Sequence, residues 1–330
     1  MGEAITLAQS SDAPHGENPR VGCVIVDASG AIVGRGYHRG AGTPHAEVAA
    51  LADAGERALG ATAVVTLEPC AHTGRTGPCT AALLAAGITG VVFAQADPTP
   101  QAGGGAQVLR AAGLDVIEGV RVDEAARINT AWTFAAMHLR PMVTWKVAVS
   151  LDGRVAGPDG GPTAITGAAA RALVHELRAD VDAIVVGTGT ALVDDPSLTV
   201  RVPGREIANP PLRVVVGSRP IPPDAHVLDD AAPSLLIDES NPAVLLSDLY
   251  QRGIRHVLLE GGPTLASAFL SAHVIDRVEW YVAPILLGAG PVALPGVDGA
   301  SLVGVDVTDV SVVGEDVRIV GHVRYEGSEA

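Results

Sequence analysis

Short apolar runs alternate with amphipathic stretches along the first 137 residues. The apolar runs are bounded by Gly, Pro, Asn or Asp, which is typical of buried strands. They predict strands at 21–26, 31–37, 63–66, 91–94 and 116–117, and the stretches between them predict helices at 3–8, 45–54, 79–86, 107–112 and 123–137. Strands that alternate with helices favour a mostly parallel sheet covered on both sides.

The alternation starts again after Arg140-Pro141, where we place a boundary between two domains, 1–140 and 141–330. The second half predicts strands at 143–149, 183–186, 213–216 and 256–260, with helices at 168–178 and from 263 to 270. The last apolar runs, at 278–287, 301–313 and 317–325, have no helical stretch between them. They predict antiparallel strands that complete a mixed sheet, so the fold class is α/β in both domains.

Composition fits two well-filled domains. The chain has 330 residues, 48% of them hydrophobic and only 3% aromatic, so the cores are expected to be built from small aliphatic side chains. No apolar run is long enough for a membrane span, and the N-terminus lacks the pattern of a signal peptide. A net charge of −15 disfavours nucleic acid as a partner. Three cysteines are too few for a disulfide framework, so we expect a cytoplasmic protein, with a homo-oligomer as an open possibility.

One segment carries residues suited to metal chemistry. His45 is followed two residues later by Glu47, and Cys70 and Cys79 each follow a proline. One imidazole and two thiols supply three ligands to a tetrahedral zinc ion and leave its fourth position open. Glu47 is not needed as a ligand and is placed to move protons. This arrangement is typical of zinc-dependent base deaminases.

Two features of this segment leave alternatives open. Eight residues separate Cys70 from Cys79, where the commoner deaminase pattern has two. His72 in that gap is an alternative fourth ligand, which would make the site a closed, structural one. Asn18, in a turn before the first strand, either hydrogen-bonds a base or only fixes the turn. Asp97 with Pro98 is read first as a plain turn, with a role in the pocket as the alternative.

The second half holds candidate groups for an anionic ligand. Lys146 lies inside an apolar strand, so it either faces a polar group or extends to solvent from an edge. Small residues at 187–190 follow a strand, and a Gly-Gly pair at 261–262 separates a strand from a helix. Backbone amides at such junctions can approach a phosphate.

With both halves in view, the whole chain resembles the bifunctional riboflavin-biosynthesis deaminase/reductase family. In the first half the resemblance rests on Asn18-Pro19-x-Val21-Gly22, His45-Ala46-Glu47 and Thr66-Leu67-Glu68-Pro69-Cys70, and the eight-residue gap before Cys79 is usual for this family. In the second half it rests on Lys146 with Ser150-Leu151-Asp152-Gly153-Arg154, on Asp194-Asp195-Pro196-x-Leu198-Thr199-x-Arg201, and on Glu260-Gly261-Gly262-Pro263-Thr264-Leu265.

The resemblance implies a cytidine-deaminase-like three-layer domain followed by a dihydrofolate-reductase-like α/β domain that binds NADPH. The first would deaminate 2,5-diamino-6-(5-phosphoribosylamino)pyrimidin-4(3H)-one. The second would reduce the ribosyl group to give 5-amino-6-(5-phosphoribitylamino)uracil. Both ligands are small molecules, and zinc and NADPH are the cofactors.

The resemblance also implies roles for individual residues. His45, Cys70 and Cys79 would hold zinc, with Glu47 as the proton shuttle. Substrate contacts would come from Asn18, Lys146, Arg178, Leu198, Arg201 and Glu260. Cofactor contacts would come from Ala148, Ala164, Thr190, Asp194, Ser218, Gly262, Pro263, Thr264, Leu265, Ala266, Ser267 and Ala268. Arg178 and Arg201 would grip the substrate phosphate, and Ser218 with Arg219 suits the 2′-phosphate of NADPH.

One segment departs from the family. Residues 162–166 read Pro-Thr-Ala-Ile-Thr where the family usually has Ser-x-Trp-Ile-Thr, so an aromatic ring and a hydroxyl are missing. This departure supports an alternative in which the C-terminal half is a non-catalytic binding domain. A nucleic-acid-editing deaminase is a further alternative, which the net charge and the lack of an aromatic and basic stripe disfavour.

Overall fold

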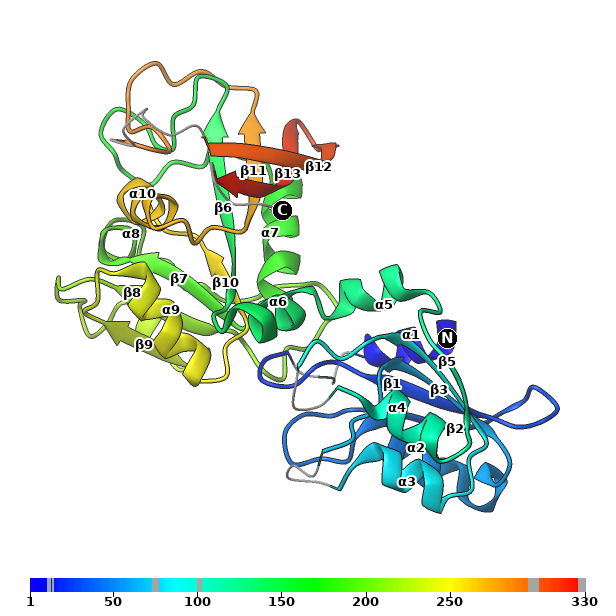
Figure 1. Ribbon diagram of the computed structural model, residues 1–330. Helices are drawn as coiled ribbons and strands as arrows, with labels where there is room; N and C mark the ends of the chain where they lie inside the picture. The colour runs from blue at the N-terminus through cyan, green and yellow to red at the C-terminus, as the bar shows by residue number, and fades with distance from the viewer. Residues whose placement is uncertain (11–12, 14, 73–76, 100–102, 296–302, 326–330) are drawn as a thin grey trace. The chain divides into compact units, whose positions relative to one another are not determined.

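The computed structural model describes residues 1–10, 13, 15–72, 77–99, 103–295 and 303–325. The chain divides into two compact units, Met1–Leu139 and Arg140–Ala330. Within the described residues no helix is long and apolar enough to cross a membrane. Each unit is built on its own sheet (Figure 1).

The first unit contains a five-stranded sheet in the order β2-β1-β3-β4-β5. Its strands are β1 (Gly22–Val26), β2 (Ile32–Tyr37), β3 (Thr62–Leu67), β4 (Gly90–Gln95) and β5 (Asp115–Ile117). β1 runs antiparallel to both β2 and β3, whereas β3, β4 and β5 are parallel. The expectation of a mostly parallel sheet is therefore wrong here. A tight turn between Asp27 and Ala31 returns the chain beside β1 and forces the antiparallel pair.

Helices cover this sheet on both faces, which gives three layers. The helices of this unit are α1 (Gly2–Ala8), α2 (Ala46–Ala54), α3 (Cys79–Ala85), α4 (Gly105–Ala111), α5 (Val122–Ile128) and α6 (Thr130–His138), with a 3-10 turn η1 (Gly55–Ala58) after α2. α2 packs very closely on β2, because a Cβ atom at Gly36 would lie 2.3 Å from the backbone nitrogen of Ala50. Ala46, Ala50 and Ala54 fill this interface, which explains the chain's many small side chains.

The helix expected at 123–137 is in fact two helices. α5 ends at Ile128 and α6 begins at Thr130, with Asn129 between them at φ −113°. The Asn129 side chain accepts a hydrogen bond from the backbone N–H of Arg20 and donates one to the carbonyl oxygen of Arg20, both at 2.9 Å. Asparagine favours such local backbone bonding over a continuous helix.

The second unit contains an eight-stranded sheet in the order β12-β13-β11-β6-β10-β7-β8-β9. Its strands are β6 (Met142–Ser150), β7 (Ala183–Gly187), β8 (Leu212–Val216), β9 (Ser234–Ile237), β10 (His256–Leu259), β11 (Arg277–Ala283), β12 (Val303–Val313) and β13 (Asp316–Tyr325). The strands from β11 to β9 pair in parallel, and β13 and β12 extend the sheet antiparallel. The expected mixed sheet is confirmed, but of its last three strands β11 pairs with β6 in parallel, and only β13 and β12 add antiparallel pairs.

The helices of the second unit are α7 (Ala168–Ala179), α8 (Thr188–Asp194), α9 (Pro242–Gln251) and α10 (Pro263–Ser271), with a 3-10 turn η2 (His226–Leu228). The core on one face of the sheet contains residues of α9 and α10, such as Leu246 and Phe269. A smaller core on the other face joins α7 to Tyr281 of β11. β9 and α9 were not predicted, and the small residues at 187–190, expected to follow a strand, open the short helix α8.

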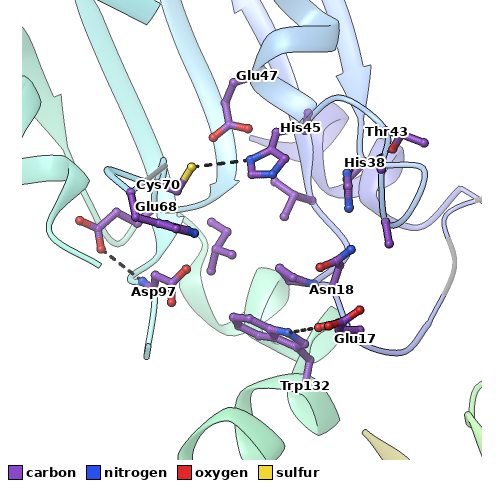
Figure 2. A pocket seen from close by; sticks show the side chains of 17 residues that line it. Glu17, Asn18, His38, Thr43, His45, Glu47, Glu68, Cys70, Asp97 and Trp132 are labelled. Atoms are coloured by element: carbon purple, nitrogen blue, oxygen red, sulfur yellow. Dashed lines mark hydrogen bonds between the residues drawn. The ribbon is translucent and has the colours of Figure 1, made fainter. Parts of the chain in front are cut away.

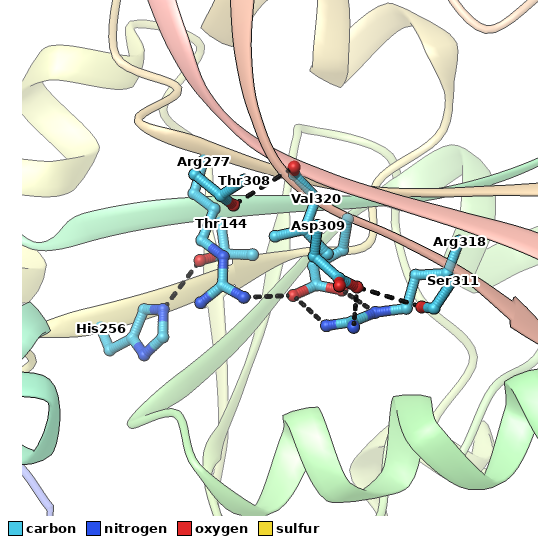
Figure 3. Close-up of polar contacts among 9 residues, drawn as sticks. Thr144, His256, Arg277, Thr308, Asp309, Ser311, Arg318 and Val320 are labelled. Carbon is cyan, nitrogen blue, oxygen red and sulfur yellow. Dashed lines mark hydrogen bonds and ion pairs between the residues drawn. The ribbon is translucent and has the colours of Figure 1, made fainter.

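A buried ionic cluster ties the antiparallel strands to the rest of this sheet (Figure 3). The carboxylate of Glu279, 1% exposed, pairs with Arg277 at 2.6 Å and with Arg318 at 2.7 Å. Arg318 also reaches Asp309 of β12 at 3.3 Å. Two guanidinium groups compensate for the removal of the Glu279 charge from water. The cluster therefore links β11, β13 and β12 by side chains as well as by their ladders.

Candidate active sites

The three expected metal ligands come together in the first unit. Cys70 lies in the loop just after β3, Cys79 is the first residue of α3, and His45 immediately precedes α2. The possible ligand atoms of these three residues all lie within 4.8 Å of one another. His45 Nδ1 is 3.1 Å from the Cys79 sulfur and 3.6 Å from the Cys70 sulfur. Figure 2 shows His45 and Cys70 pointing toward each other.

The electrostatics of the cluster suit a soft divalent cation. Hydrogen bonds from Cys79 and His45 lower the pKa of the Cys70 thiol, and the backbone N–H of Cys79 also points at its sulfur. The hydrogen bond to Cys70, together with burial, raises the pKa of the Cys79 thiol. A bound cation would favour the thiolate form of both residues. Two sulfurs and one imidazole nitrogen at this spacing fit zinc.

Glu47 lies beside this cluster without belonging to it. Its side chain is 4% exposed, and burial raises the pKa of its carboxyl group. A carboxyl group with a raised pKa is a stronger base than an ordinary carboxylate, which suits a proton carrier. His72 also lies apart from the ligand group, with an exposed side chain. Among the described residues the cluster therefore has three protein ligands, as an open site requires.

A cavity of about 340 Å³ opens beside the cluster. Its wall includes Asn18 and Asp97. For Asp97 this supports the alternative interpretation, a role in the pocket, over a plain turn. It also includes His38, Glu68 and Trp132, which the sequence reasoning did not assign to the pocket. Glu68 and His38 are close in sequence to the recognised motifs, and this proximity could have been used to place them in the pocket. Trp132 had none beyond being an aromatic residue in a chain with few of them.

A larger cavity, of about 1140 Å³, lies in the second unit. Most of the expected cofactor and substrate residues line it: Lys146, Ala148, Ala164, Thr190, Asp194, Ser218, Glu260, Gly262, Pro263, Thr264, Leu265, Ala266 and Ala268. Arg219 and the departing segment at 162–166 are part of the same wall. The volume is sufficient for a dinucleotide and a second small molecule side by side.

Four expected residues lie outside this lining. Ser267 donates its hydroxyl hydrogen to the carbonyl oxygen of Pro295 at 3.3 Å. Leu198 is 4% exposed and packs in the core, with a positive φ of 49°. Arg201 is exposed, and its backbone N–H donates to a ring nitrogen of His175. Arg178 is nearly buried and forms a two-point ion pair with Glu260, at 2.6 and 2.9 Å.

The Arg178–Glu260 pair sets the charge at one end of the cavity. Burial alone would raise the pKa of Glu260, but the charges of Arg178 and Lys146 outweigh it, and the pKa is lowered. Burial lowers the pKa of the Lys146 amine, and the charge of Glu260 opposes that shift. Lys146 therefore faces a carboxylate inside the cavity, as the first of its two sequence interpretations expected.

A second group of residues in the wall of this cavity lies around the start of α8. The hydroxyl oxygen of Thr190 accepts a hydrogen bond from the backbone N–H of Gly262 at 3.1 Å, which joins α8 to the start of α10. Arg219 donates to the Thr188 hydroxyl at 3.3 Å. A side chain at Gly189 would lie 2.9 Å from the Arg219 guanidinium, so the glycine permits this close approach. Backbone amides, hydroxyls and one cation thus converge where a phosphate group could bind.

Comparison with known proteins identifies the family. The cytidine and deoxycytidylate deaminase zinc-binding region matches residues 1–95, and the RibD C-terminal domain matches residues 141–319. The chain belongs to the RibD family. It is 51% identical to the riboflavin biosynthesis protein RibD of Mycobacterium tuberculosis over 294 residues, which cover 88% of this chain and 86% of the relative. To RibD of Escherichia coli strain K12 it is 40% identical, covering 90% and 91%.

Solved structures agree over the full length. RibD of Acinetobacter baumannii superposes with a TM-score of 0.88 at 38% identity, covering 98% of this chain and 97% of the relative. A deaminase/reductase of Thermotoga maritima superposes with a TM-score of 0.86 at 31% identity and the same coverage.

The chain is therefore a bifunctional deaminase and reductase of riboflavin biosynthesis, with a cytidine-deaminase-like domain, a reductase domain, and zinc and NADPH as cofactors. The family match does not support a non-catalytic C-terminal domain or a nucleic-acid-editing enzyme.

Proposed function

We propose that the cavity of the first unit is the deaminase site and that the cavity of the second unit is the reductase site. The observation that carries the first assignment is a group of three metal ligands within 4.8 Å of one another beside the buried Glu47. The substrate in this proposal is 2,5-diamino-6-(5-phosphoribosylamino)pyrimidin-4(3H)-one. The Thermotoga maritima relative supports it by its name, diaminohydroxyphosphoribosylaminopyrimidine deaminase and 5-amino-6-(5-phosphoribosylamino)uracil reductase.

In the deaminase site, His45, Cys70 and Cys79 would hold zinc, which supplies the Lewis acidity that activates water at neutral pH. Glu47 takes a proton from the attacking water and delivers one to the departing amino nitrogen, so that ammonia leaves and a carbonyl forms. Its raised pKa suits both transfers. Asn18 and Asp97, in the cavity wall, present hydrogen-bonding groups to the edges of the pyrimidine.

In the reductase site, bound NADPH would supply a hydride to the ribosyl carbon, and a proton taken up by the sugar chain would complete the addition of two hydrogens. The cofactor would be held by Thr190, Asp194, Ser218 and residues 262–268. The sugar of the substrate would contact Lys146 and Glu260. Arg178 fixes the carboxylate of Glu260 and also donates to the carbonyl oxygen of Thr199 at 3.1 Å. Its guanidinium keeps two further N–H groups, which together with the exposed Arg201 would bind the substrate phosphate.

The proposal extends to the setting of the enzyme. The deaminase domain would span 1–140 and the reductase domain 141–330. Free thiols as metal ligands and a reduced nicotinamide cofactor both suit the cytoplasm. We also propose that the chain forms a homo-oligomer, because β12 is an edge strand with three exposed apolar side chains, those of Val307, Val310 and Val312. Light scattering measures that state directly.

The test is incubation of the zinc-loaded protein with the diaminopyrimidine substrate, with and without NADPH, and identification of the products by mass. Without NADPH we expect ammonia and the deaminated uracil. With NADPH we expect a product that carries two more hydrogens on its sugar chain. Glu47→Gln should stop the first reaction and leave the second intact when the deaminated compound is supplied. Ammonia release that persists in that variant would refute the assignment of the first site.

A further inference from the structure

We propose that Trp132 forms the wall against which the pyrimidine ring of the substrate packs, and that α6 positions Asn18 in the same cavity. Trp132 lies more than fifty residues after the last metal ligand in the chain, so no motif points to it. This inference rests on the proposed deaminase site and adds a substrate-binding residue, Trp132, and a positioning residue, Asn129, to it.

The indole of Trp132 lines the cavity on the side away from the metal cluster. Figure 2 shows it beside Asn18 and Glu17, with His45 and Glu47 across the cavity. The indole N–H donates a hydrogen bond to the carbonyl oxygen of Glu17 at 3.2 Å. The polar atom of the ring is therefore already used, and what the ring offers to a ligand is apolar carbon surface.

A second, independent set of bonds comes from the residue that opens α6. Asn129 is 4% exposed and holds the backbone of Arg20 at two points, through its carbonyl oxygen and its amide nitrogen. A side-chain amide matches the N–H and C=O groups of one residue, as a neighbouring strand would. Glu17 and Arg20 are thus both tied to one helix, and Asn18 lies between these two anchors. The position of Asn18 in the cavity is set by α6.

The chemistry of the substrate gives this wall a function. A diaminopyrimidine must present the edge that carries its amino group to the metal cluster, so its flat faces need surfaces of their own. Stacking on an aromatic side chain suits any nucleic-acid base. Trp132 is the only tryptophan, tyrosine or phenylalanine among the described residues that line this cavity. Its ring is the surface in the described wall best suited to a flat heterocycle.

The kinetic test compares substitutions on α6. Trp132→Ala removes the wall and should raise the KM of deamination by about tenfold to a hundredfold, with a smaller change in kcat. Trp132→Phe keeps an aromatic surface and should recover most of the loss. Phe134→Ala is the matched control, because Phe134 lies on the same helix, stacks on His138 and is not in the cavity wall. Zinc content and reductase activity report whether each variant is folded.

The role of Asn129 has its own variant. Asn129→Asp keeps an acceptor for the Arg20 N–H but loses the donor to its carbonyl oxygen. A displaced Asn18 should then raise the KM, while bound zinc stays at one ion per chain. An unchanged KM in Asn129→Asp would overturn the positioning role.

Tryptophan fluorescence measures substrate binding without catalytic turnover. The chain has three tryptophans, and Trp132 is the only one in the first unit; Trp145 and Trp280 meet edge to face in the second. Substrate added to the Glu47→Gln protein should change the emission, and the added Trp132→Phe substitution should remove that change. A signal of equal size in the double variant would belong to Trp145 and overturn the inference.

The two proposals fail separately. If Glu47→Gln is inactive but Trp132→Ala keeps the KM of the parent within twofold, only the wall is wrong. If Glu47→Gln keeps its activity, the deaminase site itself is misassigned.

Discussion

Glu47 and Glu68 lie in the wall of the same cavity and have different surroundings. Burial raises the pKa of Glu47, which has the metal-ligating thiols close by. Glu68 instead accepts hydrogen bonds from the backbone N–H groups of Asp97 and Ala106, at 3.2 and 2.9 Å. Glu68 thereby fastens the segment after β4 to the cavity, whereas Glu47 is available for proton transfer. The environment, rather than the residue type, assigns these two roles.

Glu47→Gln should therefore separate chemistry from metal binding. The amide cannot exchange protons, so deamination should fall by a factor on the order of 100 or more. Zinc content, measured by atomic absorption, should stay at one ion per chain, because the ligand group does not include Glu47. Loss of zinc in this variant would make Glu47 a ligand and contradict the assigned role.

Cofactor choice is a second property of single residues. Ser218 and Arg219 are exposed in the wall of the larger cavity, just after β8. On a chain of net charge −15, the 2′-phosphate of NADPH needs a local donor and a local cation. Replacing both residues with Ala should weaken NADPH binding by about 2–4 kcal/mol, as expected for lost charge-assisted hydrogen bonds. NADH, which lacks the phosphate, should bind as before.

Titration calorimetry with both cofactors measures this difference. Arg252→Ala is a suitable control, since Arg252 is an exposed arginine just after α9 and outside the cavity wall. A double variant that keeps its full preference for NADPH would show that other residues read the phosphate.

Residues that belong to a recognisable motif were the ones that sequence reasoning could place. His45 with Glu47, and Cys70 with Cys79, belong to local motifs, and the structure brings all three metal ligands together. The pair of Arg178 with Glu260 joins positions 82 residues apart, and the bond from Trp132 to Glu17 spans 115. Such contacts depend on how the sheet orders its strands, which the local pattern does not contain.

At the scale of elements, strong periodic signals gave most strands and helices to within a few residues. The break at Asn129 was missed because the apolar pattern continues through it. α9 was also missed, although Asn241 followed by Pro242 is a good helix start. Asn241 accepts a hydrogen bond from the Ala243 N–H at 2.9 Å, and proline is favoured at the first helical position.

The junction between β7 and β10 gives an element-scale prediction that depends on pH. Asp182, just before β7, accepts hydrogen bonds from the backbone N–H groups of Arg255 and His256, at 2.7 and 2.9 Å. Burial nevertheless raises its pKa to about 6. The folded state thus holds this proton more tightly than the unfolded chain does. Stability from Asp182 is complete below its unfolded pKa of about 4 and is lost as pH rises through about 6.

Asp182→Asn cannot ionise but keeps an acceptor oxygen for the two N–H groups. Between about pH 5.5 and pH 7.5, the difference in unfolding free energy between variant and parent should shift in favour of the variant by about 1 kcal/mol. Urea unfolding followed by the fluorescence of Trp145 and Trp280 reports on this unit. Asp248→Asn, at an exposed site on α9, should show no such shift. A pH-independent difference for Asp182→Asn would mean that Asp182 is already ionised throughout this range.

At the scale of the whole molecule, each of the two cavities is lined by residues of one unit. The metal ligands and Glu47 all come from Met1–Leu139, and the residues around the larger cavity all come from Arg140–Ala330. The positive charges that an anionic cofactor and substrate require, such as Lys146 and Arg219, are inside the second cavity on a chain that is acidic overall. The two activities should therefore be separable without dividing the chain.

Removal of zinc tests that separation. A chelator should abolish ammonia release from the diaminopyrimidine substrate, because the zinc held by the three ligands supplies the Lewis acidity that activates water. Oxidation of NADPH with the deaminated compound should continue at the rate of the parent, and added zinc should restore the first reaction. Cys70→Ala should reproduce the chelated state, whereas Cys23→Ala, which removes a buried thiol of β1 outside the ligand group, should keep its zinc. Loss of both reactions on chelation would mean that zinc also supports the reductase unit, which contributes none of the ligands.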